Sequence, residues 1–508
     1  MKRVIGLGMV SVLLLSACVE ADQVEVEEQV EELVISRNFE KPPGAADYLH
    51  NYQDTVIPEL DTDTLQSLTE ERELADRLTR EEMEEDLKTF LSAMRYGYGP
   101  YEFYGGDEAF LSAADDMMQW VSSADAEVEG EDYADQLREH FSFIKDQHFV
   151  IHGQNAYEKE LAQYGVEEWT FTKENEAYFF NDEEVTLIND ESPEDLLKPS
   201  FDENGELIYR AVSLSEGEAE QWEIETAADI YTGKPEKLFT NPGGMKPFEV
   251  SETDTDIPVI TWRTMLAYED DPYTYDDMLD TVDLIKEAPA AILDLRNNMG
   301  GNLYLVNKFI HELTGSPPSH SETVFLETNT VHALLSHTRE TLEETGLDSE
   351  TFYDHLPEAV YGEYDANFTD VSPISRVETF GTEWAGTGVE ISKEPSLDTP
   401  LYVLMNENTA SAGEIMVEAL MEYDNTVLIG GPSAGVFTSD MGSMLFLPHS
   451  GIMIGMPSTL IMSPYSYGRE AVGLEPDVWL SGDGVMVRTV EWAERMLAEE
   501  ELAEEVAQ

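Results

Sequence analysis

The chain has 508 residues, of which 106 are acidic and 28 are basic, so its formal net charge is −78. So large a negative charge excludes nucleic-acid binding and disfavours contact with a bare anionic membrane, because both surfaces are negatively charged. Its single cysteine excludes an intrachain disulfide framework and a cysteine-rich zinc site. With 42% hydrophobic residues the chain can form packed cores, and its length predicts about three domains.

The first residues predict an exported protein with a lipid anchor. Lys2 and Arg3 precede an apolar run at residues 4–15 that is too short to span a membrane and is typical of a secretory signal peptide. The sequence Leu-Ser-Ala-Cys that ends at Cys18 resembles a bacterial lipobox, so residues 1–17 are the predicted signal peptide and Cys18 the predicted lipidation site. An ordinary signal peptide with an incidental cysteine is the alternative. The mature protein is expected to be extracytoplasmic, a cell membrane lipoprotein held by its lipid alone.

Three further segments differ in composition and periodicity. Residues 18–45 are acid-rich and end near Pro-Pro-Gly, which predicts a tether. Residues 46–160 carry apolar side chains at helical spacing and predict a helical N-terminal domain; one such series is Leu87, Phe90, Leu91 and Met94. Residues 165–250 contain short alternating stretches between turn residues and predict a small β-rich domain. Residues 485–508 predict an acidic amphipathic helix.

Residues 255–482 show a strand, turn and helix pattern that occurs twice. The buried strands are expected at 290–295 and 401–405, and each is followed by a turn and an amphipathic helical face. A third strand is expected at 427–429. Strands that alternate with helices predict a partly parallel α/β core with right-handed crossovers. The long polar segment 320–398 is predicted to be an insertion into this core.

Ser411 lies in the second of these turns, beside Ala410, Ala412 and Gly413. Small neighbours permit close approach of a substrate, and the N-terminus of the following helix supplies free N–H groups and a positive dipole end. An attacking serine needs such exposure, and it needs donors for the oxyanion that forms. A serine here is equally suited to cap the helix, so this turn alone leaves the nucleophile undecided.

The first turn, residues 298–302, contains Gly300 and Gly301. Because both turns follow strands of one parallel sheet, we expect them at the same edge. Two glycines let the chain approach a ligand and offer backbone N–H groups. The turn lacks the lysine of a P-loop and the glycine spacing of a dinucleotide-binding motif, so it does not favour nucleotide binding.

Four motifs in order, ILDLRNNMGGN, VLMNENTASAGEIMVEAL, VLIGGPSAG and EAVGLEPD, lie between about residues 257 and 480. Together they resemble the core of the tail-specific (C-terminal processing) serine protease family. The resemblance implies an α/β, ClpP/crotonase-like protease core with Ser411 as nucleophile. It implies an oxyanion hole from the backbone N–H groups of Ala412 and Gly301, with Gly300 as the alternate. It also implies a peptide or protein substrate, with no metal and no cofactor.

The better-known branch of that family has a lysine base at the position that Val436 occupies here, and no lysine follows Lys393. The chain therefore resembles the branch of the tricorn core protease and the interphotoreceptor retinoid-binding modules, which takes its base from an upstream histidine in a DGHT-like pattern. The segment FIKDQHF is similar to that pattern and makes His148 the candidate base, because a near-neutral imidazole can accept and return a proton. His449 and His152 compete for this role, and a structural role for His148 is the other interpretation.

In the same branch a glutamate of the closing motif completes a charge relay, and Glu470 holds that position. The serine that the family places beside the histidine is replaced here by Gln147, so the route from Glu470 to His148 is left open. The β-rich segment occupies the place where many relatives carry a PDZ-like domain, which adds a peptide strand to a sheet edge. A degenerate PDZ-like domain and an unrelated scaffold are both retained.

The sequence thus predicts an extracytoplasmic, lipid-anchored serine endopeptidase that works by a Ser-His-Glu type relay through an acyl-enzyme. The alternative is a catalytically inactive lipoprotein that binds peptides or lipophiles on the same scaffold. Two features keep this alternative: Val436 replaces the family lysine, and the retinoid-binding relatives use such a core for binding.

Overall fold

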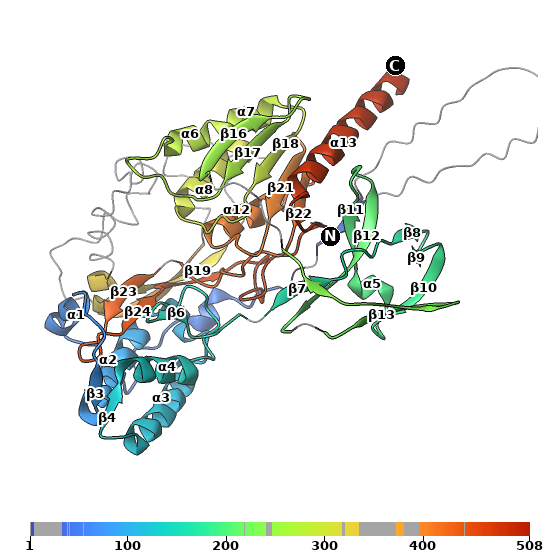
Figure 1. Ribbon diagram of the computed structural model, residues 1–508. Coiled ribbons are helices and arrows are strands. Elements are labelled where there is room, and N and C mark those ends of the chain that lie inside the picture. The colour runs from blue at the N-terminus through green and yellow to red at the C-terminus, as the bar shows by residue number, and fades with distance from the viewer. Residues whose placement is uncertain are drawn as a thin grey trace, which may run out of the picture.

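The computed structural model describes residues 2–4, 33–37, 39, 41–53, 55–159, 161–217, 219–239, 246–316, 321–334, 372–379, 396–440 and 442–507. Cys18, most of the predicted tether and most of the predicted insertion lie outside these ranges. Figure 1 shows three parts: an α/β core at the upper centre, a helical unit at the lower left and a β-rich unit on the right. Within the described residues, no helix combines the length and apolar character that crossing a membrane requires.

The α/β core is built on a six-stranded sheet with the order β16-β17-β18-β21-β22-β26. The first pair is antiparallel and the other four pairs are parallel. The strands are β16 (Phe248–Glu252), β17 (Pro258–Trp262), β18 (Ala291–Asp294), β21 (Leu401–Met405), β22 (Thr426–Gly430) and β26 (Val478–Trp479). The core sheet therefore begins at residue 248, within the segment predicted to be part of the β-rich domain.

Both faces of this sheet are covered, which explains why its central strands are apolar throughout. On β21, Val403 packs into one hydrophobic cluster with the helices that precede and follow the strands, whereas its neighbours Tyr402 and Leu404 pack with α13 on the opposite face. The helices are α6 (Tyr275–Leu279), α7 (Thr281–Glu287), α8 (Leu303–Thr314), α12 (Ala412–Leu420) and α13 (Val485–Ala507). Because β18 and β21 are adjacent and parallel, the turns that follow them lie at the same edge.

The helical unit lies N-terminal to the candidate base. Its elements are η1 (Ala45–Tyr48), α1 (Thr62–Leu68), β3 (Arg77–Thr79), α2 (Arg80–Gly97), η2 (Gly99–Tyr101), α3 (Gly106–Ser123), β4 (Glu127–Glu129) and α4 (Gly130–His140). A capping box between Thr79 and Glu82 begins α2, which satisfies two N–H groups at its start. On the apolar series of α2, Leu87, Phe90 and Met94 are fully buried.

The helical unit shares a sheet and a hydrophobic core with the C-terminal part of the chain. The sheet has the order β23-β24-β5-β6, and in it Ile151 is paired with Ile454. The strands are β5 (Val150–Ile151), β6 (Gln154–Asn155), β23 (Ser443–Phe446) and β24 (Met453–Met456). Phe90 and Phe141 belong to the same buried cluster as Leu445 and Ile454. The two segments thus form one packed body.

A third small sheet also joins this body. Its order is β20-β19-β25, and all its pairs are antiparallel. The strands are β19 (Glu322–Glu327), β20 (Ile374–Thr379) and β25 (Thr459–Met462). Figure 1 shows β19, β23 and β24 as a band between the helical unit and the α/β core.

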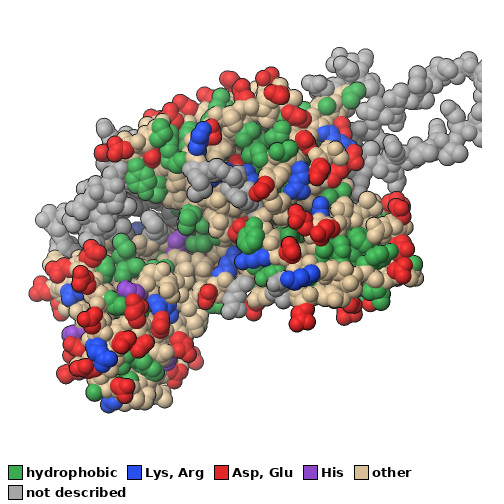
Figure 2. All heavy atoms as spheres, viewed as in Figure 1, with side chains coloured by type: hydrophobic (Ala, Val, Ile, Leu, Met, Phe, Trp, Pro, Cys, Tyr) green, Lys and Arg blue, Asp and Glu red, His purple; other side chains and the backbone are tan. Residues whose placement is uncertain are grey.

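The β-rich unit consists of antiparallel strands in two sheets, β14-β13-β10-β9-β8 and β11-β12-β7-β15. Its elements are β7 (Ala162–Gly165), β8 (Thr172–Glu174), β9 (Ala177–Phe180), β10 (Glu183–Ile188), α5 (Pro193–Leu196), β11 (Leu197–Phe201), β12 (Leu207–Ser215), β13 (Trp222–Thr226), β14 (Ile230–Gly233) and β15 (Glu236–Lys237). Its main buried cluster contains residues of this unit alone. Near the N-terminus, β1 (Lys2–Val4) pairs with β2 (Val34–Ser36). The whole is a mixed α/β fold with several sheets, and acidic side chains are spread over all three parts of the face shown in Figure 2.

Candidate active site

Ser411 occupies a strained turn between β21 and α12. Its backbone has φ 53° and ψ −125°, a combination that costs energy for any residue with a Cβ atom. The same combination differs from the extended conformation of an ordinary helix cap. Sharp turns of this kind present a nucleophilic side chain at the end of a strand.

The glycine turn after β18 is fastened to the Ser411 turn. The backbone carbonyl of Asn298 accepts a hydrogen bond from Ala410 N (2.8 Å), and the side chain of Asn298 donates to Trp262 O (2.7 Å). Gly300 has φ +92°, and a Cβ atom at this position would lie 2.8 Å from Ser411 Cβ. Only glycine therefore permits the two turns to lie this close.

The backbone donors around Ser411 differ in their availability. The N–H of Gly300 already donates to Asn298 Oδ1 at 2.8 Å, so it is less available than that of Gly301, and its role as the alternate oxyanion donor stays a prediction. The N–H groups of Gly301 and Ala412 have no acceptor within the described part of the chain. These two groups lie at the turn and at the helix start, where donors for an oxyanion are required.

His148 reaches Ser411 from the loop between α4 and β5. Its Nε2 lies 3.0 Å from Ser411 Oγ, within hydrogen-bond distance. The pairing of β5 with β24 fixes the end of this loop against the core. Desolvation in these packed surroundings lowers the pKa of His148 to about 4, so the ring is neutral near pH 7 and can accept a proton.

The two competing histidines lie elsewhere. His449 is in the turn between β23 and β24, where its Nε2 is 2.8 Å from Glu85 and its backbone N–H donates to Asp86. His152 has its Nε2 3.8 Å from Glu131. Both rings therefore contact carboxylates of the helical unit, and neither has a hydrogen bond to Ser411.

Two residues without a role in the sequence prediction lie beyond the other side of the His148 ring: Ser439 contacts the ring, and Asp146 binds Ser439. Ser439 Oγ lies 3.5 Å from His148 Nδ1 and donates to the carboxylate of Asp146, with 2.8 Å to each oxygen. Asp146 is the acidic residue of the DGHT-like pattern, so the pattern contained a signal for it. Ser439 lies far along the chain, and no motif marked it.

Glu470 does not contact the His148 ring among the described hydrogen bonds. Its Oε1 accepts from Gln147 N, and its Oε2 accepts from the N–H groups of Phe437 and Thr438, each at 2.8 Å. The hydroxyl of Thr438 donates to the same Oε2. Glu470 thus joins the loop of His148 to the loop of residues 437–438, and its predicted part in a relay stays a prediction.

A second buried carboxylate, that of Glu414, supports the nucleophile turn. It accepts hydrogen bonds from the backbone N–H groups of Ser411 (3.1 Å), Gly435 (2.7 Å) and Val436 (2.8 Å). Burial raises the pKa of Glu414 to about 7 despite these bonds. Val436, which stands at the position of the family lysine, thus donates its backbone N–H to the carboxylate of Glu414.

A lysine does lie near this turn, although it comes from the other end of the chain. Lys159 Nζ donates to the carbonyl of Ala434 at 2.6 Å and lies 3.4 Å from that of Ser433. Burial lowers the pKa of Lys159. Its contacts hold the 433–436 turn, and no motif marked this long-range contact.

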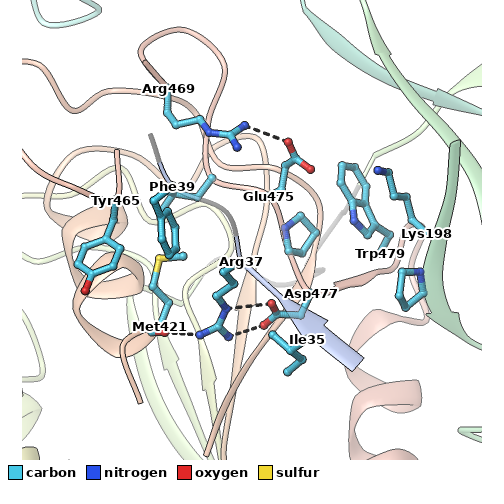
Figure 3. Close-up of a pocket in the computed structure, with 13 residues that line it drawn as sticks. Ile35, Arg37, Phe39, Lys198, Met421, Tyr465, Arg469, Glu475, Asp477 and Trp479 are labelled. Carbon is cyan, nitrogen blue, oxygen red and sulfur yellow. Dashed lines mark hydrogen bonds and ion pairs between the residues drawn. The ribbon is translucent and has the colours of Figure 1, made fainter. Parts of the chain in front are cut away.

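Neither a metal cluster in the described ranges nor the cavity beside Arg37 coincides with Ser411. In the described ranges, no group of three or more His, Cys, Asp or Glu side chains is arranged to hold a metal. A cavity of about 370 Å³ lies between segment 35–39, β11 and the stretch 474–479. Figure 3 shows Arg37 inside it, bound to Asp477 and to the carbonyl of Met421.

A comparison with protein families matches the segment that contains the four motifs. The family model described as peptidase family S41 matches residues 257–480. A Chlamydia pneumoniae protein is 25% identical over 191 residues, which are 33% of this chain and 29% of that protein, so the match spans less than a third of the relative.

Among solved structures, mature CPAF has a TM-score of 0.41 and 13% identity, covering 82% of this chain and 96% of its own. The photosystem II D1 C-terminal processing protease has a TM-score of 0.34 and 13% identity, covering 79% of this chain and 93% of its own. The family match includes both turns of the candidate site, Gly301 as well as Ser411. Residues 257–480, which contain this site, are thus similar to peptidase family S41.

Proposed function

We propose that the protein is a serine endopeptidase that hydrolyses peptide bonds through an acyl-enzyme. The observation that carries the proposal is the 3.0 Å contact between His148 Nε2 and Ser411 Oγ. It joins a neutral imidazole to a serine on a strained turn, which is the arrangement of an activated nucleophile. The match of residues 257–480 to a peptidase family supports the same conclusion.

In the first half of the reaction, Ser411 Oγ attacks the carbonyl carbon of the peptide bond while His148 Nε2 takes its proton. The N–H groups of Gly301 and Ala412 stabilise the oxyanion. When the tetrahedral intermediate collapses, the C–N bond breaks and His148 gives the proton to the leaving amine. An ester on Ser411 remains.

In the second half, a water molecule attacks the ester and His148 takes a proton from the water. Collapse of the second intermediate releases the carboxylic acid, and the proton returns to Ser411. Glu470 supports the base indirectly in this proposal, since it binds the backbone of Gln147 beside His148. Apart from the water molecule, every group in this scheme belongs to the chain or to its substrate.

The location and architecture complete the proposal. The signal-peptide pattern and the lipobox-like sequence at Cys18 support an extracytoplasmic protein on a lipid anchor. The parallel sheet with helices on one face and α13 on the other supports a crotonase-like core. The place of the β-rich unit before that core supports a degenerate PDZ-like domain as its origin.

A fluorophosphonate probe tests the activity without a known substrate. The folded protein should be labelled at Ser411, as located by mass spectrometry of the modified peptide. Ser411→Ala should abolish labelling, whereas Ser443→Ala, which removes a buried hydroxyl on β23 that has no partner in the described structure, should not. If well-folded protein is not labelled, the binding lipoprotein with Val436 in place of the lysine is the better account.

A further inference from the structure

We propose that Asp146 and Ser439 are positioning residues, which together orient the His148 ring and balance its positive charge during the reaction. This inference rests on the proposed function, because it assigns the second half of the relay that begins with Ser411 and His148. It names two residues that link a carboxylate to His148, a route that the family resemblance left open.

The direction of the hydrogen bonds follows from the nucleophile. For Ser411 to lose its proton to Nε2, this nitrogen must be unprotonated, so the ring proton lies on Nδ1. The acceptor beside Nδ1 is Ser439 Oγ at 3.5 Å. Ser439 must then donate its own proton, and the carboxylate of Asp146 lies 2.8 Å from it. The 3.5 Å contact is the longest in the series from Ser411 to Asp146. Catalytic hydrogen bonds often shorten when substrate binds.

Asp146 is itself held from three parts of the molecule. Besides Ser439, it accepts a hydrogen bond from the hydroxyl of Tyr98 at 2.9 Å and from the backbone N–H of His148 at 3.0 Å. Tyr98 follows α2, His148 lies in the loop before β5, and Ser439 lies in the segment before β23. The side chain of Asp146 is fully buried. A carboxylate fixed in this way can hold the direction of the serine hydroxyl, and through it the imidazole.

Glu470 has a different task in this arrangement. Its oxygens are occupied by the N–H groups of Gln147, Phe437 and Thr438. Gln147 is adjacent to His148, and Thr438 is adjacent to Ser439. Glu470 therefore sets the distance between the two loops, while Asp146 and Ser439 contact the ring directly or through one hydroxyl.

In this proposal the carboxylate of Asp146 supplies the negative charge that balances the His148 imidazolium. The titratable groups that face Asp146 are Tyr98, Tyr104, Asp440 and Glu470. Burial raises the pKa of both Asp146 and Glu470, and the charge of Asp146 raises that of Glu470 further. Of the two carboxylates, that of Asp146 is the one bonded to Ser439, so its charge is one hydroxyl away from the ring.

The test compares two buried serines by their effect on fluorophosphonate labelling. Ser439→Ala should lower the maximal labelling rate of Ser411 about 10- to 100-fold, the range expected when a general base loses its support. The probe concentration at half-maximal rate should stay constant, because Ser439 contacts Nδ1 and not the Nε2 side of the ring, where Ser411 lies. Ser439→Thr, which keeps the hydroxyl, should recover most of the rate. Ser443→Ala is the matched control and should label like the wild type.

Two further readouts separate positioning from a structural role. Asp146→Asn removes the charge that favours imidazolium, so the acidic limb of the pH–rate profile, which reports the pKa of His148, should move to lower pH. The downfield proton resonance of the His148 Nδ1–H should shift in Ser439→Ala and stay unchanged in Ser443→Ala. If Ser439→Ala does not fold, Ser439→Cys provides the same comparison with a weaker acceptor and donor.

The outcomes are distinct from those of the proposed function. A folded Ser439→Ala protein that labels at the wild-type rate, with an unchanged pH profile, overturns the inference and leaves the peptidase intact. A wild type that is not labelled overturns the peptidase. The Nδ1–H resonance then still decides whether Ser439 binds the ring.

Discussion

The helical unit and the β-rich unit are attached to the α/β core in different ways. The helical unit contributes β5 and β6 to a sheet whose other strands are β23 and β24, and its aromatic side chains share a buried cluster with those strands. The β-rich unit packs its main cluster from its own residues and meets α13 through contacts such as the ring pair of Phe201 and Trp492, 4.4 Å apart. His148 and Asp146 come from the helical unit, whose strand β5 is hydrogen-bonded to β24 of the C-terminal part.

This difference teaches which part of an appended domain can supply a catalytic group. A base must stay within about 3 Å of its nucleophile, and small displacements are costly to the rate. A shared sheet and a shared core meet this demand, because close-packed interiors resist displacement. A unit that packs mainly on itself is suited to roles that tolerate movement. The predictions below test this contrast.

The largest effect is expected from removal of the base. His148→Ala should reduce the fluorophosphonate labelling rate of Ser411 by about 10³-fold or more, because the serine loses its proton acceptor. The rate is followed by in-gel fluorescence over time at fixed probe concentration. Circular dichroism of the variant should match the wild type.

The control for this change is another histidine attached to the helical unit. His449→Ala removes a contact with Glu85 at the surface and should change the labelling rate by less than about twofold. A strong loss of labelling in His449→Ala, with none in His148→Ala, would show that His449 is the base and would contradict the proposal.

A smaller effect is expected from equal cavities made in the two units. Phe141, in the cluster shared with the core, and Phe171, in the β-rich cluster, are both fully buried. Phe→Ala at either position should lower the free energy of unfolding by about 3–5 kcal/mol, as measured by urea denaturation. Only Phe141→Ala should also slow labelling under conditions where both variants are folded, because its loop leads to His148.

The contrast would fail if Phe171→Ala slowed labelling as much as Phe141→Ala. That result would mean that the β-rich unit transmits its packing to the catalytic loop. Equal losses of stability with unequal losses of labelling are the expected pattern.

The parts of the site that could be predicted from the sequence are those set by near neighbours. Ser411 and Gly300 each follow a buried strand and precede a helix, so their turns were visible as local patterns. The contact of His148 with Ser411 spans 263 positions, and its prediction needed the family resemblance. The same holds for the predicted role of Glu470, which contacts three backbone N–H groups and the hydroxyl of Thr438.

The missed features depend on pairing between distant segments. β5 has only two residues, too few for an alternating pattern, yet its pairing with β24 joins the helical unit to the core. Ser439 and Lys159 become part of the site only when loops from opposite ends of the chain meet. No local periodicity carries information about such contacts.

The smallest effect is a pH dependence of stability that differs between the core and the β-rich unit. Burial raises the pKa of Glu418 on α12 to about 7, whereas hydrogen bonds from Glu206 and Asn204 lower that of Asp202 in the β-rich unit, against a desolvation effect that raises it. The folded state therefore holds the Glu418 proton more tightly than the unfolded state does. The contribution of the protonated Glu418 to the stability of the folded state is fully present below about pH 4. It is lost as the pH rises through about 7.

Glu418→Gln should remove this dependence, because an amide is neutral at every pH. The difference in unfolding free energy between variant and wild type should therefore change by about 1–3 kcal/mol between pH 5 and pH 8, in favour of the variant at the higher pH. Asp202→Asn is the control, since Asp202 is ionised in both states over this range and the difference should stay constant.

His148, whose pKa is lowered to about 4, acts in the opposite direction. The unfolded state takes up the proton of this histidine first as the pH falls below about 6.5. Urea titrations at several pH values separate these contributions, and a constant Glu418→Gln difference would place that carboxylate in contact with water.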